Sequence, residues 1–255
     1  MKRKTFLCWM NAEDQPSSVI SAKLGNAEKP FFVRLTGGCG FMSRSDGEES
    51  IKVLLDTLTG FNGVLLYGGT RVYEPSSSSL SEFSVFPTIL EVPPMLRKIN
   101  RGMMSFGIIP RLTNVEFDAD LGLIISKNDE NGFLTVIHPN QDICLVLQRD
   151  VDRGFPGDKY WDIEWRFCLE VVKSFLENRN NSGTVLISYN GGVSTGKEIE
   201  AWANNNWPVI LFENSGRVTT EFCRNTEWLA AHPSVFVAKS SEDAREQLTL
   251  LGGLS

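Results

Sequence analysis

The chain has little of what a metal centre or a disulfide framework requires. It contains only two histidines, His138 and His232, and neither lies near a pair of cysteines. A zinc site needs clustered histidine or cysteine ligands, so we expect no metal. The cysteines are dispersed without any C-x-x-C spacing, which indicates reduced thiols, mostly in the core, of a cytoplasmic protein. They are Cys8, Cys39, Cys144, Cys168 and Cys223.

Long hydrophobic runs are missing as well. No stretch approaches the length of a transmembrane helix, so we expect no contact with a membrane. The chain begins with basic side chains at positions 2–4, but the apolar segment 6–10 that follows is too short for the core of a signal peptide. Both absences favour a location in the cytoplasm.

Positive charge is in deficit. Lysine and arginine total 25 against 31 aspartates and glutamates, which gives a formal net charge of −6 and a pI near 5.1. This balance disfavours a broad footprint on nucleic acid or on a membrane surface. It remains compatible with a local basic pocket for one phosphorylated small molecule.

What the sequence does contain fits one α/β domain. Its 255 residues are 42% hydrophobic, enough for a sizeable core, and no segment has the composition of a linker between domains. We therefore expect a single nucleotide-binding domain over residues 1–255, with its core at about 31–250.

Short apolar runs alternate with segments of helical spacing along this core. Continuous apolar strands between helices predict a mainly parallel sheet with helices on both faces. The expected strands are 31–36, 63–67, 105–110, 143–147, 184–187, 209–212 and 234–238, with shorter candidates at 121–125 and 133–137. The expected helices are 48–58, one from Pro93 or Pro94 to 99, 162–178, one from Lys197, one from about Val218, and 241–250.

Glycine-rich turns stand at the ends of four of these strands. A strand that passes through a glycine turn into a helix leaves backbone N–H groups available to hold an anion. Such turns on consecutive units point to the same edge of a parallel sheet, where open α/β sheets bind ligands. The residues are Gly37 and Gly38, Gly68 and Gly69, Gly191 and Gly192, and Ser215 with Gly216.

Hydroxyl side chains accompany these turns. Thr70, Ser194, Thr195 and Ser215 could each donate to a phosphate or cap a backbone, and both roles can coexist. In particular, Thr195 is expected to cap the helix that begins at Lys197.

Three arginines follow strand ends. Arg217 could clamp a phosphate with its planar guanidinium or pair with Glu221 one helical turn on, and its place after Ser215 and Gly216 favours the ligand. Arg71 and Arg111 are weaker candidates for the same task. At the end of another strand, Glu213 could accept hydrogen bonds from ribose hydroxyls.

The aromatic group Tyr160, Trp161 and Trp165 opens the segment 162–178. These rings could stack on a base. At helical spacing, packing into the core is the simpler interpretation.

The order and content of the glycine turns resemble the SLOG superfamily, which includes the LOG phosphoribohydrolases and the DNA-processing Smf/DprA proteins. The resemblance is greatest to its LSDAT branch, the N-terminal nucleotide-sensing domain of melastatin-type TRP channels and its prokaryotic relatives. It spans about residues 31–236. The motifs are Leu-Thr-Gly-Gly at 35–38, Leu-Tyr-Gly-Gly-Thr at 66–70, Asn-Gly-Gly-Val-Ser-Thr at 190–195, Pro-Val-Ile-Leu at 208–211 and Asn-Ser-Gly-Arg-Val at 214–218. In addition, His-Pro-Asn at 138–140 and Arg166 fall where the LSDAT branch has similar residues.

This resemblance implies a Rossmann-like fold and a sensor that binds ADP-ribose, cyclic ADP-ribose or another NAD-derived nucleotide. The turns would hold the pyrophosphate, and no further cofactor is implied. A sensor reports to something, so an effector protein and self-association stay open as partners. The implied ligand-binding residues are Thr36, Gly37, Gly38, Gly68, Gly69, Thr70, Arg71, Arg111, Arg166, Gly191, Gly192, Ser194, Thr195, Glu213, Ser215, Gly216 and Arg217.

Two other functions remain open. The LOG enzymes carry P-G-G-x-G-T-x-x-E, whose glutamate acts at the ribosidic bond; Glu198 keeps that position here, although the proline and the third glycine are absent. Glu198 could then serve a nucleotide N-glycosidase or phosphoribohydrolase, or it could simply favour the dipole of its helix. Binding of nucleic acid in the manner of DprA is disfavoured by the acidic charge.

Overall fold

The computed structural model describes residues 6–10, 20, 30–38, 42–75, 83–100, 102–110, 116–128, 132–147, 160–178 and 183–254. Their strands form two sheets. The larger has eight strands, all paired in parallel. In spatial order they are β1 (Phe6–Met10), β10 (Ile143–Leu147), β6 (Met104–Pro110), β3 (Val64–Tyr67), β2 (Phe32–Thr36), β11 (Thr184–Ser188), β12 (Val209–Phe212) and β13 (Val235–Ala238).

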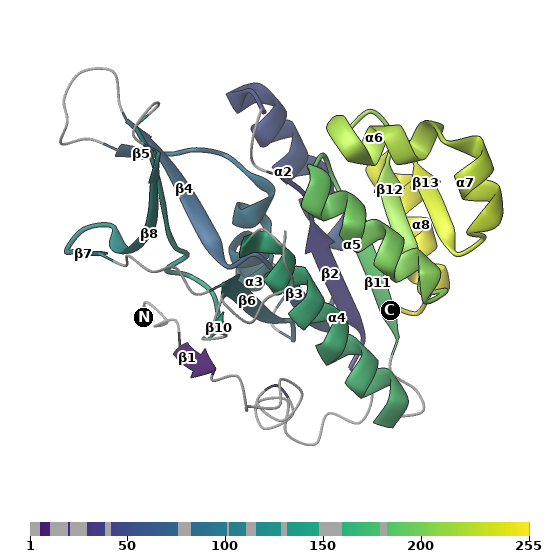
Figure 1. The fold of residues 1–255 in the computed structure, drawn as a ribbon, viewed down its shortest axis with the longest axis horizontal. Helices are drawn as coiled ribbons and strands as arrows, with labels where there is room; N and C mark the ends of the chain where they lie inside the picture. The colour runs from purple at the N-terminus through teal and green to yellow at the C-terminus, as the bar shows by residue number, and fades with distance from the viewer. Residues whose placement is uncertain are drawn as a thin grey trace.

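Helices cover both faces of this parallel sheet, as the continuous apolar strands predicted. One face packs against α2 (Arg44–Leu58), α3 (Val92–Ile99) and α8 (Ser241–Leu250). The other packs against α4 (Tyr160–Asn178) and α5 (Val193–Asn204), which lie side by side across the front of Figure 1. The Rossmann-like α/β fold class is therefore confirmed.

The alternation of side chains along β2 decides which residues reach which face. Val33 and Leu35 pack with the α2, α3 and α8 layer, whereas Phe32 packs with the α4 and α5 layer. Successive side chains of a strand point to opposite faces. Arg34 and Thr36 thus project toward α4 and α5, the layer that supplies their partners.

The second sheet has five antiparallel strands and was not predicted as a sheet. In order these are β5 (Phe83–Val85), β4 (Thr70–Pro75), β9 (Phe133–Ile137), β8 (Gly122–Asn128) and β7 (Glu116–Asp118). It occupies the left of Figure 1, beside the parallel sheet. Because β4 starts directly after Gly68 and Gly69, the antiparallel sheet is connected to the parallel sheet at the carboxyl end of β3.

Most predicted helices and strands form within a few residues of their expected bounds, and Ser240 is the N-cap of α8, where its side chain accepts the Asp243 N–H. One expectation was wrong: α5 begins at Val193, four residues before Lys197, so Thr195 lies inside its first turn and does not cap it. The other helices given for the described residues are η1 (Ile89–Glu91), α6 (Arg217–Arg224) and α7 (Thr226–Ala231), and the sequence had not predicted the last of these.

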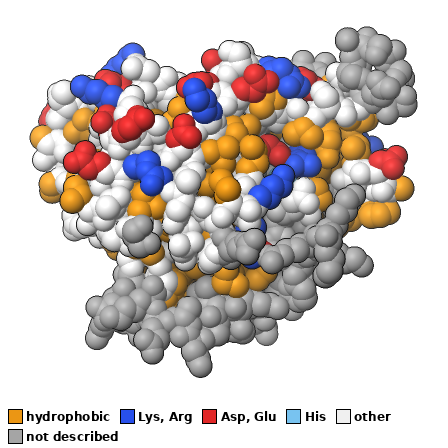
Figure 2. Space-filling model, turned by 180° about the vertical axis from the view of Figure 1, so that it is seen from behind, with side chains coloured by type: hydrophobic (Ala, Val, Ile, Leu, Met, Phe, Trp, Pro, Cys, Tyr) orange, Lys and Arg blue, Asp and Glu red, His pale blue; other side chains and the backbone are white. Residues whose placement is uncertain are grey.

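The cysteines whose side chains the structure describes are all free thiols. Cys144 and Cys168 are buried free thiols and Cys223 is half-buried, as predicted for reduced core cysteines. On the face opposite α4 and α5, basic and acidic side chains are interspersed (Figure 2). Among the described residues, no helix is both long and apolar enough to cross a membrane, and no group of histidine, cysteine and acidic residues is arranged to hold a metal ion.

Candidate functional site

A pocket of about 410 Å³ opens at the carboxyl ends of β2 and β11. These neighbours mark the reversal of strand order: the chain runs outward from β2 through β3 and β6, and later continues on the other side of β2 with β11 and β12. Open α/β sheets bind ligands at this switch point. The pocket lining draws on both sheets and comprises Arg34, Leu35, Thr36, Gly37, Gly68, Thr70, Val72, Ile89, Leu90, Thr135, Glu164, Trp165, Gly192, Val193, Ser194, Thr195, Glu198 and Arg217.

The amino terminus of α5 forms one end of the pocket. Gly192 is the N-cap residue, and it has no side chain with which to bond the N–H groups of the first turn. Gly192 and the helix residues Val193, Ser194 and Thr195 all line the pocket. An uncapped helix terminus offers unpaired N–H donors and the positive end of the helix dipole, which together suit an anion.

Arg217 lies beside this terminus. A Cβ atom built on Gly192 would be 2.7 Å from its Nη2, and one built on Gly38 would be 3.1 Å from its Nη1. The guanidinium thus lies against two of the glycine turns. Arg217 has a φ of 46°, a left-handed conformation that is costly for a residue with a side chain. Such strain is concentrated at functional sites.

Asn190 joins the three turns that surround the guanidinium. Its side-chain Nδ2 donates to the carbonyl of Gly38 over 2.8 Å, and its backbone N–H donates to Oγ of Ser215 over 2.9 Å. Its backbone carbonyl accepts a hydrogen bond from the Thr219 hydroxyl. Asn190 has a φ of 61°, a conformation that asparagine tolerates better than most residues. The Ser215 hydroxyl, predicted as a phosphate donor, also accepts a hydrogen bond that links two turns.

A buried cluster of charge forms the floor of the pocket. Arg34 donates from Nε to Oε1 of Glu198 over 2.6 Å and from Nη2 to Oε2 over 3.3 Å. The Thr36 hydroxyl also donates to Oε2 of Glu198. On the other side, Nη1 of Arg34 lies 2.8 Å from Oε1 of Glu164. Two carboxylates therefore share one guanidinium at the base of the site.

Burial sets the titration of Glu164 apart from that of an ordinary glutamate. It raises the pKa of Glu164 to about 7, against the opposing attraction of Arg34 and with the help of repulsion from Glu198. Burial likewise raises the pKa of the neighbouring Cys168 thiol well above its usual value, which keeps that thiol protonated. Glu164 is thus poised to change its protonation state near neutral pH.

Arg34 and Glu164 are the charged lining residues that the sequence reasoning missed. Arg34 interrupts a strand whose other residues are apolar or small, and a charge in a buried strand requires a buried partner. That signal was present at 31–36 in the sequence. The partners Glu164 and Glu198 lie 130 and 164 residues further along the chain, so their identity could not be read from local spacing.

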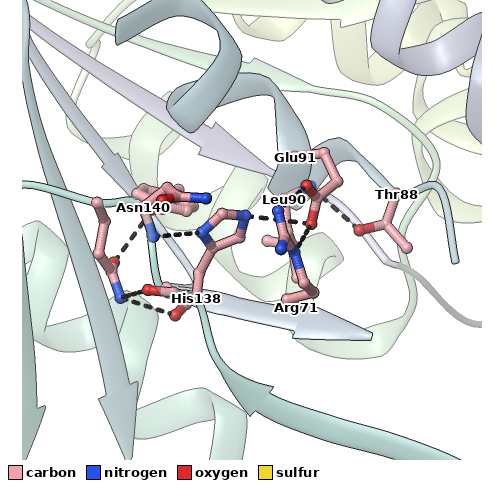
Figure 3. Close-up of polar contacts among 9 residues, drawn as sticks. Arg71, Thr88, Leu90, Glu91, His138 and Asn140 are labelled. Carbon is pink, nitrogen blue, oxygen red and sulfur yellow. Dashed lines mark hydrogen bonds and ion pairs between the residues drawn. The ribbon is translucent and has the colours of Figure 1, made fainter. Parts of the chain in front are cut away.

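Arg71, predicted at the ligand, does not line the pocket, although its neighbour Thr70 does. It donates to both carboxylate oxygens of Glu91, over 2.8 and 2.6 Å (Figure 3). Burial alone would raise the pKa of Glu91, but the contacts with His138 and Arg71 outweigh it and lower the pKa to about 2. This cluster joins β4 to η1, whose Ile89 and Leu90 form a wall of the pocket.

His138 completes the same cluster from the connection after β9. Its Nδ1 accepts the backbone N–H of Asn140 over 3.1 Å, and its Nε2 lies 3.2 Å from Oε1 of Glu91 (Figure 3). Burial lowers the pKa of His138, partly offset by Glu91, so the ring is neutral at pH 7 with its proton on Nε2. The His138 side chain therefore fixes Glu91, and with it the η1 wall of the pocket, although His138 itself does not line the pocket.

Of the remaining predicted residues, the pocket takes in Thr36, Gly37, Gly68, Thr70, Ser194 and Thr195. Gly69 packs instead against Gly107, where a Cβ atom would meet backbone at 2.8 Å. Arg166 lies over the ring of Trp165, 5.3 Å from its centroid, and Trp165 itself lines the pocket. Outside the lining stand Gly38, Gly69, Arg71, Arg166, Gly191, Glu213, Ser215 and Gly216; Arg111 and the side chains of Tyr160 and Trp161 lie outside the described residues.

The fold and the pocket define a Rossmann-like α/β protein with a pocket at the switch point of its parallel sheet. No protein-family model and no curated protein matches the chain. Solved structures do resemble it. TM1055 aligns with a TM-score of 0.50 at 16% identity, over 86% of this chain and 99% of that one.

Two further structures are similar at slightly lower scores. The molybdenum cofactor carrier protein of Chlamydomonas reinhardtii aligns with a TM-score of 0.49 at 15% identity, over 88% of this chain and 98% of that one. The molybdenum cofactor binding protein of Rippkaea orientalis gives 0.48 at 18% identity, over 88% and 98%. At such identities the likeness concerns the fold alone. Membership of the SLOG superfamily and of its LSDAT branch stays a prediction from the sequence motifs.

Proposed function

We propose that the protein is a sensor that binds an NAD-derived nucleotide, such as ADP-ribose or cyclic ADP-ribose, without consuming it. The observation that carries this proposal is the juxtaposition of the uncapped α5 terminus with Arg217 at one end of the pocket. Backbone donors, a helix dipole and a guanidinium converge there, and all three favour a phosphate group.

The rest of the pocket suits the remainder of a nucleotide. Its volume of about 410 Å³ falls within the range of roughly 300–1,000 Å³ that small-molecule sites occupy. The lining also includes Trp165, Leu90 and Val72 together with Thr70 and Thr135. An aromatic and apolar wall with a few polar groups is what a base requires.

A thermal-shift and calorimetric screen with ADP-ribose, NAD, AMP and adenosine tests the proposal. A ligand at a hundred times its dissociation constant stabilises the folded state by about 2.7 kcal/mol. Because the phosphates supply most of the recognition, ADP-ribose should bind far more tightly than adenosine. Equal binding of adenosine and ADP-ribose, or no binding of any phosphorylated compound, contradicts the proposal.

A second candidate, a nucleotide N-glycosidase or phosphoribohydrolase, is favoured by one observation: two buried carboxylates, Glu164 and Glu198, face the pocket. Two carboxyl groups in one site can act as a general acid and a general base. Against it, both oxygens of Glu198 already accept hydrogen bonds from Arg34 or Thr36.

Chromatography of the same nucleotides after incubation with the protein separates the two candidates. The sensor releases no free base, and Glu198→Gln leaves that result unchanged. Release of base by the wild type that is lost in Glu198→Gln, and kept in the exposed control Glu200→Gln on the same helix, would establish the enzyme.

A further inference from the structure

The floor of the pocket contains two buried polar atoms whose hydrogen-bonding capacity is not met. They are Nη1 of Arg34 and Oε1 of Glu164, whose side chains are 3% and 9% exposed. The atoms lie 2.8 Å apart, close enough for an ion pair, yet neither makes a hydrogen bond of acceptable geometry within the described part of the chain. Buried polar groups without hydrogen-bond partners are rare in folded proteins and call for an explanation.

The remaining guanidinium nitrogens of Arg34 are paired with Glu198. Nε and Nη2 of Arg34 both donate to Glu198, and Glu198 also receives the Thr36 hydroxyl. The unmet donor and the unmet acceptor therefore lie side by side, on residues that both line the pocket. A ligand that fills them must present an acceptor and a donor on adjacent atoms.

We propose that Arg34 and Glu164 form a sugar subsite that binds the vicinal hydroxyls of a ribose. One hydroxyl donates to Oε1 of Glu164, and its neighbour accepts from Nη1 of Arg34. This inference rests on the proposed function and refines it, since it assigns the ribose of the nucleotide to the floor and a phosphate to the α5 end. A carboxylate that accepts from ribose hydroxyls is also how dinucleotide-binding folds read that sugar.

Charge excludes a phosphate from the same place. Glu164 and Glu198 bring two carboxyl groups to the floor against the single guanidinium of Arg34. A phosphate group at the floor would be repelled by these carboxyl groups, whereas neutral hydroxyl groups would not. The sequence had assigned ribose recognition to Glu213, but that residue is not part of the lining.

Calorimetry with ADP-ribose and its two monodeoxy analogues, each lacking the 2-hydroxyl of one ribose, tests the subsite. A hydrogen bond to a charged group is worth about a ten- to a hundredfold change in affinity, so one analogue should bind the wild type that much more weakly than ADP-ribose. In Glu164→Leu the difference between ADP-ribose and that analogue should shrink to less than about threefold, because the acceptor is gone.

Two controls keep the outcomes separate. Glu170→Gln, an exposed glutamate on the same helix, should discriminate like the wild type. Should Glu164→Leu melt well below the wild type, Glu164→Met, which is unbranched like glutamate but has no oxygen to accept a hydroxyl, replaces it. Equal binding of all three ligands to the wild type, or discrimination that persists without Glu164, overturns the subsite alone. Failure of all three to bind overturns the proposed function together with it.

Discussion

At the scale of single residues, Arg217 combines a strained backbone with an exposed side chain that reaches two glycine turns. Arg217→Ala should weaken the binding of ADP-ribose by about ten- to a hundredfold, because a charge-assisted contact with phosphate is lost. The melting temperature without ligand should hardly change, since exposed charges contribute little to stability. Titration calorimetry and a thermal melt of the same preparation provide both measurements.

The matched control is Arg224→Ala, an exposed arginine at the opposite end of α6. It should keep full affinity. Unchanged affinity in Arg217→Ala with a clearly lower melting temperature would show that Arg217 is structural. Gly192→Ala tests the same contact independently. Its Cβ atom would press on Nη2 of Arg217 at 2.7 Å, so ADP-ribose should bind more weakly, while the φ of −116° is one that alanine can adopt without strain.

The free energy of unfolding should depend on pH through Glu164, and a single substitution can isolate that contribution. Its pKa lies near 4.5 in the unfolded chain and at about 7 in the folded protein, where burial is the main cause. Between these values the folded state binds more protons, so the stability that this group contributes is complete below about pH 4.5 and is lost as the pH rises through about 7. Glu164→Gln removes the titration, and its free energy of unfolding relative to wild type should rise from about pH 5 to about pH 8.

Urea denaturation of both proteins at the two pH values measures this change. Glu170→Gln should track the wild type at each pH. A difference between Glu164→Gln and wild type that stays constant with pH would mean that Glu164 is ionised throughout.

At the scale of helices and strands, local sequence predicted the parallel sheet well and the antiparallel sheet hardly at all. Buried strands such as β11 are continuous apolar runs, and α2, α4 and α8 show helical spacing, so each could be recognised alone. The strands β4, β5 and β7 are half-exposed or short and depend on partners distant in sequence. Gly192 as N-cap also left no capping side chain to mark the start of α5.

The link between η1 and β4 yields the prediction at this scale. Arg71 and Glu91 form a bidentate pair whose side chains are 16% and 10% exposed. Arg71→Ala leaves a largely buried carboxylate unpaired and should lower the free energy of unfolding by about 2–4 kcal/mol. Affinity for ADP-ribose, measured below the melting temperature, should fall less than in Arg217→Ala, because Arg71 does not line the pocket. A loss of affinity with intact stability would instead place Arg71 at the ligand.

At the scale of the whole molecule, the site arises from long-range assembly. The glycine turns, the α5 terminus and Arg217 could be predicted from sequence because each is a local strand–turn–helix pattern. The charged floor could not, because β2, α4 and α5 are distant in sequence and meet only in the folded structure. The wall supplied by Thr70, Val72 and Thr135 likewise requires the antiparallel sheet to pack beside the turns.

A pocket lined by both sheets makes the single-domain organisation over residues 1–255 testable. If the sheets fold as one unit, calorimetry should record one thermal transition, and ADP-ribose should move all of it. At a hundred times the dissociation constant, the stabilisation of about 2.7 kcal/mol corresponds to an upward shift of roughly 5–10 °C for a chain of this size. Arg217→Ala, at the same ligand concentration, should show a clearly smaller shift. Two transitions, of which the nucleotide moves only one, would mean that the antiparallel sheet unfolds separately and adds little to the binding site.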